Sequence, residues 1–157
     1  MHKESFRIVL IEPEIPQNTG NIARLCACTG CELYLVGKLG FLITDKHLKR
    51  AGLDYWDEVK IEQYNNLEEL KEKFPDNNFY YLTTKAEKLY TEMQFKPGDF
   101  LVFGSETKGL PKELIEENIN NSLKIPMKIE RRSLNLSNCA SIVLYEAIRQ
   151  TNYFDNN

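Results

Sequence analysis

Short apolar, β-branched runs recur along the chain and are separated by stretches with helix-like patterning. Strands are predicted at residues 7–11, 33–36, 79–82, 100–104 and 123–127, with a weaker candidate for an edge strand at 59–64. Helices are predicted at residues 20–29, 45–51, 66–74, 111–118 and 136–150. Alternating strands and helices are typical of an α/β fold, a parallel sheet with helices on both faces. Because no repeat, low-complexity segment or linker interrupts this pattern, we expect a single domain over residues 1–157.

The last predicted helix has the clearest pattern. Its apolar positions recur at helical spacing and form one stripe: Ala140, Val143, Leu144, Ala147 and Ile148. Ser137 has the residue type of an N-cap and is predicted to begin this helix. The preceding segment, "RRSLNLSN" (131–138), is rich in hydrogen-bonding side chains. Such a loop either lines a binding site or is a solvated connection, and both interpretations stay open at this point.

Composition and charge narrow the class of protein. Hydrophobic residues make up 42% and charged residues 27% of the chain, as in ordinary soluble domains. The formal net charge is −3, so any contact with nucleic acid must come from a local basic patch. No apolar run approaches the roughly 20 residues that span a bilayer, and the first residues have no signal-peptide pattern. We therefore expect a cytoplasmic protein without a membrane segment.

Three of the four cysteines, Cys26, Cys28 and Cys31, are clustered, and Cys139 is distant. Such a cluster could bind a metal ion, but structural zinc usually requires four ligands. If residues 20–29 are helical, Cys26 and Cys28 point about 160° apart and cannot share one ion. Cys26 falls on the apolar face, and Gly30 has the position of a helix C-cap. We therefore predict free thiols and no metal.

Arg24 lies on the opposite side of the same predicted helix, away from its apolar face. A guanidinium there is either a solvated surface charge or directed at an anionic group. The preceding residues 16–21, "PQNTGN", form a donor-rich approach to a helix N-terminus. Free N–H groups and the helix dipole favour negative charge at such a place, which supports the second interpretation.

A glycine-bearing loop, "FGSETKGLP" (103–111), follows a predicted strand and leads into a helix, with Pro111 at its first position. The loop has no Walker A pattern, and the chain has no Gly-x-Gly-x-x-Gly fingerprint, so triphosphate and ordinary dinucleotide binding lose support. Gly104 lies at the carboxyl end of a strand, where open α/β sheets bind ligands. The alternative is a plain connection between a strand and a helix.

Three strand ends are expected to meet if these strands are parallel neighbours. They are the ends of "YYLTT", "VFGSETKG" and "KIPM". Their loops would form a crevice lined by backbone groups and walled by Leu82, Ile125 and Leu134. Such a crevice suits a flat heteroaromatic ring that is recognised by main-chain hydrogen bonds between apolar side chains.

These segments closely resemble the SPOUT superfamily of RNA methyltransferases. The resemblance is carried by "IVLIEPEIPQNTGNIARLCACTG", "LGFLITDKHLKRAGLDYW", "LTTK", "GDFLVFGSETKGLP" and "IPMKIERRSLNLSNCASIVLYEAIRQ", which cover nearly the whole chain. Within the superfamily, the match is to the small, single-domain tRNA wobble-nucleotide 2′-O-methyltransferases of the TrmL/YibK type. The resemblance implies an α/β-knot, in which the C-terminal segment threads into a trefoil knot, and a homodimer.

The resemblance also implies a cofactor, S-adenosyl-L-methionine, with S-adenosyl-L-homocysteine as its product. Carried over onto this sequence, the cofactor contacts fall on six positions: Leu82, Gly104, Ile125, Ser133, Leu134 and Asn138. The implied reaction moves a methyl group to the ribose 2′-OH of wobble nucleotide 34 of tRNA, a cytidine or modified uridine, on leucine isoacceptors.

The arginine of the family's "NTGNIxR" motif lands on Arg24, which the resemblance assigns to the reacting hydroxyl. A guanidinium rarely gives up its proton, so we expect Arg24 to orient the hydroxyl or to stabilise the developing alkoxide. Affinity for the anticodon stem-loop is expected from local basic residues, Lys46, Arg50 and Arg131 with their neighbours His47, Lys49, Lys108 and Arg132.

Two other functions remain open from the sequence. One is a related superfamily enzyme that modifies another RNA target. The other is a dimer that binds S-adenosylmethionine or RNA without catalysis, and the intact Arg24, Ser133 and Asn138 argue against it.

Overall fold

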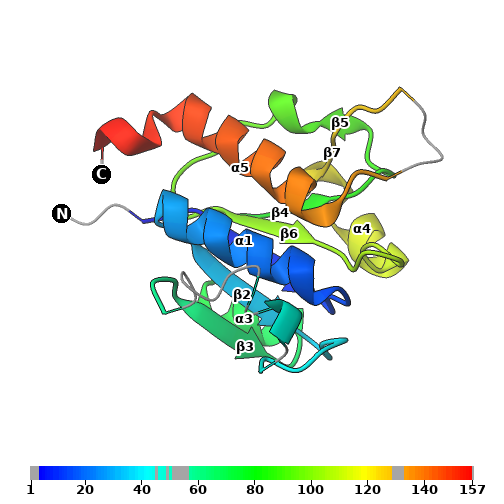
Figure 1. Ribbon diagram of the computed structural model, residues 1–157. Helices are drawn as coiled ribbons and strands as arrows, with labels where there is room; N and C mark the ends of the chain where they lie inside the picture. The colour runs from blue at the N-terminus through cyan, green and yellow to red at the C-terminus, as the bar shows by residue number, and fades with distance from the viewer. Residues whose placement is uncertain (1–3, 45, 49, 51–56, 129–132, 157) are drawn as a thin grey trace.

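The structure is a computed structural model that describes residues 4–44, 46–48, 50, 57–128 and 133–156. One seven-stranded sheet runs through this part of the chain in the order β3-β2-β1-β6-β4-β7-β5 (Figure 1), and every pair of neighbouring strands is parallel. The strands are β1 (Arg7–Ile11), β2 (Glu32–Val36), β3 (Ile61–Tyr64), β4 (Phe79–Leu82), β5 (Lys88–Leu89), β6 (Phe100–Phe103) and β7 (Ser122–Lys124).

Helices cover both faces of the sheet. The long helices α1 (Pro16–Thr29) and α5 (Leu136–Thr151) lie side by side on one face (Figure 1). The short helices α3 (Leu67–Lys73) and α4 (Lys112–Glu117) contribute to the core on the other face. Three 3₁₀ turns complete the described structure, at Tyr90–Glu92, Ile119–Asn121 and Tyr153–Asn156. The predicted α/β class with a parallel sheet between helices is confirmed.

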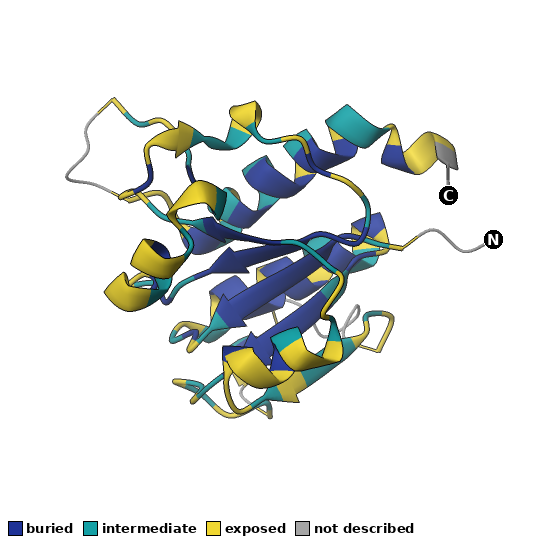
Figure 2. Ribbon diagram, turned by 180° about the vertical axis from the view of Figure 1, so that it is seen from behind, coloured by how far each residue is buried: buried dark blue, intermediate teal, exposed yellow. Residues whose placement is uncertain are grey.

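The central strands are buried on both faces because each face is covered (Figure 2). In β1, Ile8 and Leu10 point into the core beneath α1 and α5, whereas Val9 points into the core beneath α3 and α4. Burial of each such side chain contributes about 1.5–3 kcal/mol. Among the described residues, no helix has the length and hydropathy to span a membrane.

The predicted strands agree with the structure to within a few residues, and the candidate at 59–64 is the edge strand β3. The strand expected at 123–127 is shorter, because pairing with β4 and β5 ends at Lys124. The two-residue strand β5 is too short to leave a pattern and was not predicted. Residues 46–48 and 50 of the helix expected at 45–51 are helical, and 45, 49 and 51 lie outside the described residues. The trefoil knot stays a prediction.

Two predicted helix ends are wrong. The first helix begins at Pro16 rather than at residue 20, because proline needs no hydrogen-bond partner in the first turn and Gly20 is tolerated inside the helix. The last helix is capped by Asn135 rather than Ser137. The Asn135 carboxamide oxygen accepts from the backbone N–H groups of Ser137 at 2.9 Å and Asn138 at 3.4 Å.

Candidate functional site

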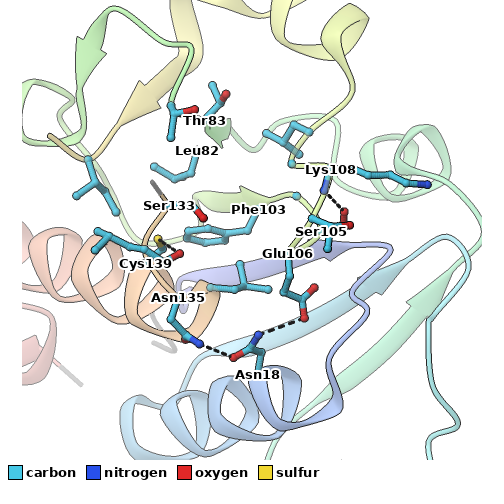
Figure 3. Close-up of a pocket in the computed structure, with 18 of the residues that line it drawn as sticks. Asn18, Leu82, Thr83, Phe103, Ser105, Glu106, Lys108, Ser133, Asn135 and Cys139 are labelled. Atoms are coloured by element: carbon cyan, nitrogen blue, oxygen red, sulfur yellow. Dashed lines mark hydrogen bonds between the residues drawn. The ribbon is translucent and has the colours of Figure 1, made fainter. Parts of the chain in front are cut away.

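A cavity of about 450 Å³ opens where β4, β6 and β7 end, and we call it the first cavity (Figure 3). These three strands are neighbours, so their carboxyl ends meet at one edge of the sheet, the carboxyl edge. Ligands of open α/β sheets bind in this position, and the volume lies within the roughly 300–1,000 Å³ of small-molecule sites. Five of the six predicted cofactor residues line the cavity, namely Leu82, Gly104, Ile125, Ser133 and Leu134.

The strand ends supply the apolar walls of the first cavity. Leu82 ends β4 and pairs with Leu123 of β7, which places Ile125 just beyond the neighbouring strand end. Leu82 and Ile125 are half-buried against the core, and Leu134 is exposed at the rim. Thr83 donates its N–H to the Leu123 carbonyl at 2.9 Å, which fixes the first residue after β4. Apolar side chains and main-chain groups therefore surround the same space, as predicted.

The β6–α4 loop (residues 104–111) forms another wall and is tightly closed. A Cβ atom on Gly104 would overlap the carbonyl carbon of Gly109 and the amide nitrogen of Leu110. Gly109 has φ of 66° and donates to the Ser105 carbonyl at 3.0 Å, and Lys108 donates its N–H to the Ser105 hydroxyl at 3.2 Å. Glycine at position 104 is therefore a packing requirement of this loop.

A chain of hydrogen bonds joins three separate segments around the first cavity (Figure 3). The Glu106 carboxylate accepts from the Asn18 side-chain amide at 3.2 Å, and the Asn18 carbonyl oxygen accepts from the Asn135 side-chain amide at 3.0 Å. Glu106 comes from the β6–α4 loop, Asn18 from the first turn of α1, and Asn135 from the cap of α5. This series of hydrogen bonds therefore fixes the spacing of three walls of the cavity, whose residues lie up to 117 positions apart in sequence.

A second pair of contacts fastens the same loop to the segment before α1. Glu106 also accepts from the backbone N–H groups of Glu14 at 2.9 Å and Ile15 at 2.7 Å. In return, the Glu14 carboxylate accepts from the Thr107 hydroxyl at 2.6 Å and from its N–H at 3.2 Å. These bonds from Thr107 lower the pKa of Glu14. The Glu106 carboxylate thus bonds to the backbone before α1, and the Glu14 carboxylate bonds to the backbone of the β6–α4 loop.

The backbone N–H groups just before α1 donate to an acceptor within the protein itself. The sequence predicts that negative charge is favoured at the N-terminus of this helix. In the structure the Glu106 carboxylate lies there and accepts from the backbone N–H groups of Glu14 and Ile15. An acidic side chain near a helix N-terminus is also favoured by the helix dipole. This end of α1 therefore positions a wall of the first cavity.

Arg24 and Asn138 do not line the first cavity. Arg24 is exposed on α1, six residues beyond Asn18, and therefore about 9 Å along the helix axis. Asn138 is exposed in the first turn of α5, where its N–H contacts Asn135. The predicted roles of Arg24 in catalysis and of Asn138 in cofactor binding stay predictions.

The predicted RNA-binding residues are exposed where the structure describes them. Lys46 and Arg50 lie on the helical stretch after β2, and neither lines the first cavity. Arg131 lies outside the described residues. Lys108, named with them as a basic neighbour, lines the first cavity from the β6–α4 loop.

The cysteines are arranged as the helical angle predicts. Cys26 and Cys31 are buried, whereas Cys28 is exposed. Burial raises the pKa of the Cys26 thiol, and it raises the pKa of Cys31 to about 11. Within the described ranges, no three or more His, Cys, Asp or Glu side chains are grouped so that they could hold a metal ion. Cys139 differs from the other three because it lines the first cavity.

Sequence reasoning missed Asn18, Glu106 and Asn135 as members of one network. Each was part of a segment that the sequence singled out, but none carried a pairing signal. The signal that could have found these three residues is their position, because polar side chains beside strand ends and helix starts reach neighbouring segments.

Comparison with known proteins shows where this chain has relatives. The sequence profile of the SpoU rRNA Methylase family matches residues 5–145. A tRNA (cytidine(34)-2′-O)-methyltransferase from Saccharophagus degradans is 48% identical over 149 residues, which cover 94% of this chain and 97% of the relative. A structure solved for insight into the 2-OH methylation of C/U34 on tRNA has a TM-score of 0.88 at 40% identity, and the match covers 94% of this chain and 96% of that chain.

A more distant structure shares the fold. The SpoU methyltransferase AviRb from Streptomyces viridochromogenes, solved in complex with AdoMet, has a TM-score of 0.85 at 21% identity. The match covers 96% of this chain and 62% of that chain.

Proposed function

The chain belongs to the SpoU methylase family, and from this premise we propose that it methylates the ribose 2′-OH of nucleotide 34 of tRNA with S-adenosylmethionine. The observation that carries the proposal is the first cavity. Five residues chosen from sequence as cofactor contacts line one hollow at the carboxyl edge of the sheet. The relatives support the proposed reaction and the proposed RNA substrate. One of them is a tRNA (cytidine(34)-2′-O)-methyltransferase, and it matches this chain over nearly its whole length.

The residues around the first cavity fit an adenosyl group. Leu82, Ile125 and Leu134 provide apolar contacts for the two faces of a flat ring, and the backbone of the β6–α4 loop lies beside them for its polar edge. S-adenosylmethionine, when bound, supplies an electrophilic methyl group. The protein's share is to orient the cofactor and to exclude water from its reactive side.

Arg24 is proposed to act on the substrate hydroxyl. A guanidinium stays protonated at neutral pH, so its part is to orient the 2′-OH and to stabilise negative charge as that oxygen attacks in line. Arg24 is exposed on α1 and lies on the same helix as Asn18, which the hydrogen-bond chain fixes. A rigid helix between the first cavity and Arg24 would set the distance between cofactor and hydroxyl.

The finer features follow the family resemblance and belong to the same proposal. The substrates are leucine isoacceptors with cytidine or modified uridine at nucleotide 34, and the enzyme acts in the cytoplasm as a homodimer. Cations such as Lys46 and Arg50 of one protomer would then add to the RNA surface of its partner. Exposed aromatic side chains at Tyr145 and Phe154, on α5 and just beyond it, provide apolar area for a second copy.

The test is methyl transfer with mapping of the product. Purified protein is incubated with labelled S-adenosylmethionine and tRNA from cells that lack this protein, and the label is located by mass spectrometry of nuclease fragments. We expect one 2′-O-methyl group at nucleotide 34 of leucine tRNAs. Label at another nucleotide or in ribosomal RNA would overturn the substrate assignment. Binding of S-adenosylmethionine and tRNA without transfer would show a non-catalytic protein.

A further inference from the structure

A second cavity of about 320 Å³ opens beside the first, where β1, β2 and β6 end. The backbone explains why it is open. The residues directly after β1 and β2, Glu12 and Gly37, both have left-handed φ angles, of 49° and 81°. The two paired strands therefore turn away from the sheet at the same level. A non-glycine residue in this conformation is uncommon, and strained backbone of this kind clusters at functional sites.

The turn after β1 is held in place by its neighbour. A Cβ atom on Gly37 would lie 2.7 Å from Cγ of Glu12, so the glutamate side chain lies directly over the glycine. The Glu12 N–H donates to the Val36 carbonyl at 2.8 Å, and Gly40 donates to the Pro13 carbonyl at 2.9 Å. The cavity is thus a fixed feature of the backbone.

The two cavities share a wall. Ser105, Lys108, Gly109 and Leu110 of the β6–α4 loop line both of them. A ligand in the second cavity would therefore be separated from a ligand in the first by the β6–α4 loop alone. The proposed reaction needs two substrates side by side, and only one of them is the cofactor.

The charges in the second cavity select the kind of occupant. Its cations are Lys38 and Lys108, both exposed, and neither forms an ion pair with another described residue. Its acids are Glu14, whose carboxylate is engaged by Thr107, and the exposed Glu12. A bare phosphate ion would be repelled by these carboxylates. A ribonucleotide matches the whole set, because it carries a phosphate for lysine and N–H or O–H donors for a carboxylate.

We propose that the second cavity binds a nucleotide of the RNA substrate next to the one that is methylated. This inference rests on the proposed function and specifies how its RNA is held. Lys38 and Lys108 contact the phosphate, and Glu12 accepts a hydrogen bond from the base or the ribose. Leu39 and Pro111, which also line the cavity, pack against the base. With the cofactor in the first cavity, the shared loop then sets the distance between the methyl group and the RNA backbone.

The proposal is tested by RNA binding, read without turnover. Affinity for an anticodon stem-loop RNA with unmethylated nucleotide 34 is measured by fluorescence anisotropy for wild type, Lys38→Ala and Lys96→Ala. Lys96 is the matched control, because it is exposed at the opposite edge of the sheet, just before β6. We expect Lys38→Ala to weaken binding about fivefold at 0.1 M salt, the contribution of one phosphate contact to a single strand. Lys96→Ala should bind like wild type.

A second measurement separates the two cavities. Calorimetric titration with S-adenosylhomocysteine should give the same affinity for Lys38→Ala as for wild type. RNA with 4-thiouridine on either side of nucleotide 34 should crosslink to peptides that contain residues 38–40 or 108–111. Equal losses of RNA affinity in both lysine variants, weaker cofactor binding in Lys38→Ala, or crosslinks confined to other peptides would each overturn the proposal. If no methyl is transferred but Lys38→Ala selectively weakens RNA binding, the proposed function fails and the second cavity stands.

Discussion

The two ends of α1 differ in what their side chains do. At the amino end, Asn18 is buried in a chain of hydrogen bonds that reaches the β6–α4 loop and the start of α5. At the carboxyl end, Cys26 is buried in the core, and Gly30 ends the helix in a left-handed cap whose N–H bonds to the Cys26 carbonyl. One end positions the walls of the first cavity, whereas the other packs the helix onto the sheet.

The difference shows that a conspicuous sequence feature need not mark the site. The cysteine cluster is easy to see, but two of its three thiols are buried with raised pKa values, which makes them poor nucleophiles. Asn18 is one polar residue among many in the sequence. It matters because the fold brings Glu106 and Asn135 to it.

Replacement of Arg24 should produce the largest effect. Arg24→Ala removes the group that we assign to the hydroxyl, and loss of one such charge-stabilising donor costs about 10²–10³-fold in rate. Single-turnover methyl transfer with enzyme and S-adenosylmethionine in excess measures this step. Arg24→Lys keeps the charge but loses the planar guanidinium group, so its rate should lie between the rates of wild type and Arg24→Ala. A normal rate for Arg24→Ala bound to tRNA would remove this role.

The hydrogen-bond chain should show coupling between its members. In the wild type, the Asn18 side-chain amide donates to Glu106 at 3.2 Å. Asn18→Asp replaces this donor with an oxygen, so two carboxylates face each other at that distance. We expect this change to lower the free energy of unfolding by about 2 kcal/mol, as for an unsatisfied group near a charge. Urea unfolding measures the loss, and calorimetry with S-adenosylhomocysteine should show weaker binding.

A second substitution tests whether the loss is specific to this pair. Glu106→Gln in the Asn18→Asp background removes one of the two facing negative charges, although the Glu106 oxygen that faces Asn18 also accepts the Ile15 N–H at 2.7 Å. The double variant should therefore lose less stability than the sum of the two single losses. Strictly additive losses in the double variant would show that Asn18 and Glu106 are not coupled.

The buried thiols predict a loss of stability at high pH. Burial raises the pKa of Cys31 from an ordinary 9.0 to about 11. The thiol therefore contributes stability that is complete below pH 9 and is lost as the pH rises toward 11, because the unfolded chain ionises first. Unfolding measured from pH 8 to 11 should show this decline, and Cys31→Ala should reduce its slope. Equal slopes in both proteins would contradict it.

Substitution of Cys28 should have the smallest effect. Cys28 is exposed, so native protein should react with a thiol reagent there first, and Cys26 and Cys31 should react only on unfolding. Cys28→Ser should keep wild-type methyl transfer within a factor of two, because exposed substitutions away from special features change stability by less than about 0.5 kcal/mol. A large loss of activity would give the cysteine cluster a function that we do not assign to it.

The sequence was a good guide to features that follow a local period. Apolar runs place the end of β4 at Leu82 and the end of β6 to within one residue of Phe103. The carboxyl ends of neighbouring parallel strands meet at one edge, so these strand ends also predict the location of the first cavity. The separation of Cys26 from Cys28 followed from helical geometry alone. The family resemblance added which residues to expect as cofactor contacts.

Long-range side-chain pairs could not be predicted in the same way. Glu106 bonds to backbone groups 91 and 92 residues away, and a carboxylate leaves no local pattern that names its partner. The sequence pattern puts the start of α1 four residues late, because Gly20 has the residue type of a helix boundary, although Pro16 is a favourable first residue. The second cavity depends on the backbone conformation of Glu12, which no residue type at that position announces.

The proposed binding of the cofactor by the loops at the carboxyl edge is best tested by calorimetry with S-adenosylhomocysteine. Leu134 is 39% exposed at the rim of the first cavity, and Leu42 is 73% exposed and lines neither cavity, so aspartate at either place should leave the fold intact. We expect one binding site per chain, binding weakened at least about tenfold by Leu134→Asp, and no change with Leu42→Asp. No uptake by the folded wild type, or equal affinities in all three proteins, would contradict it.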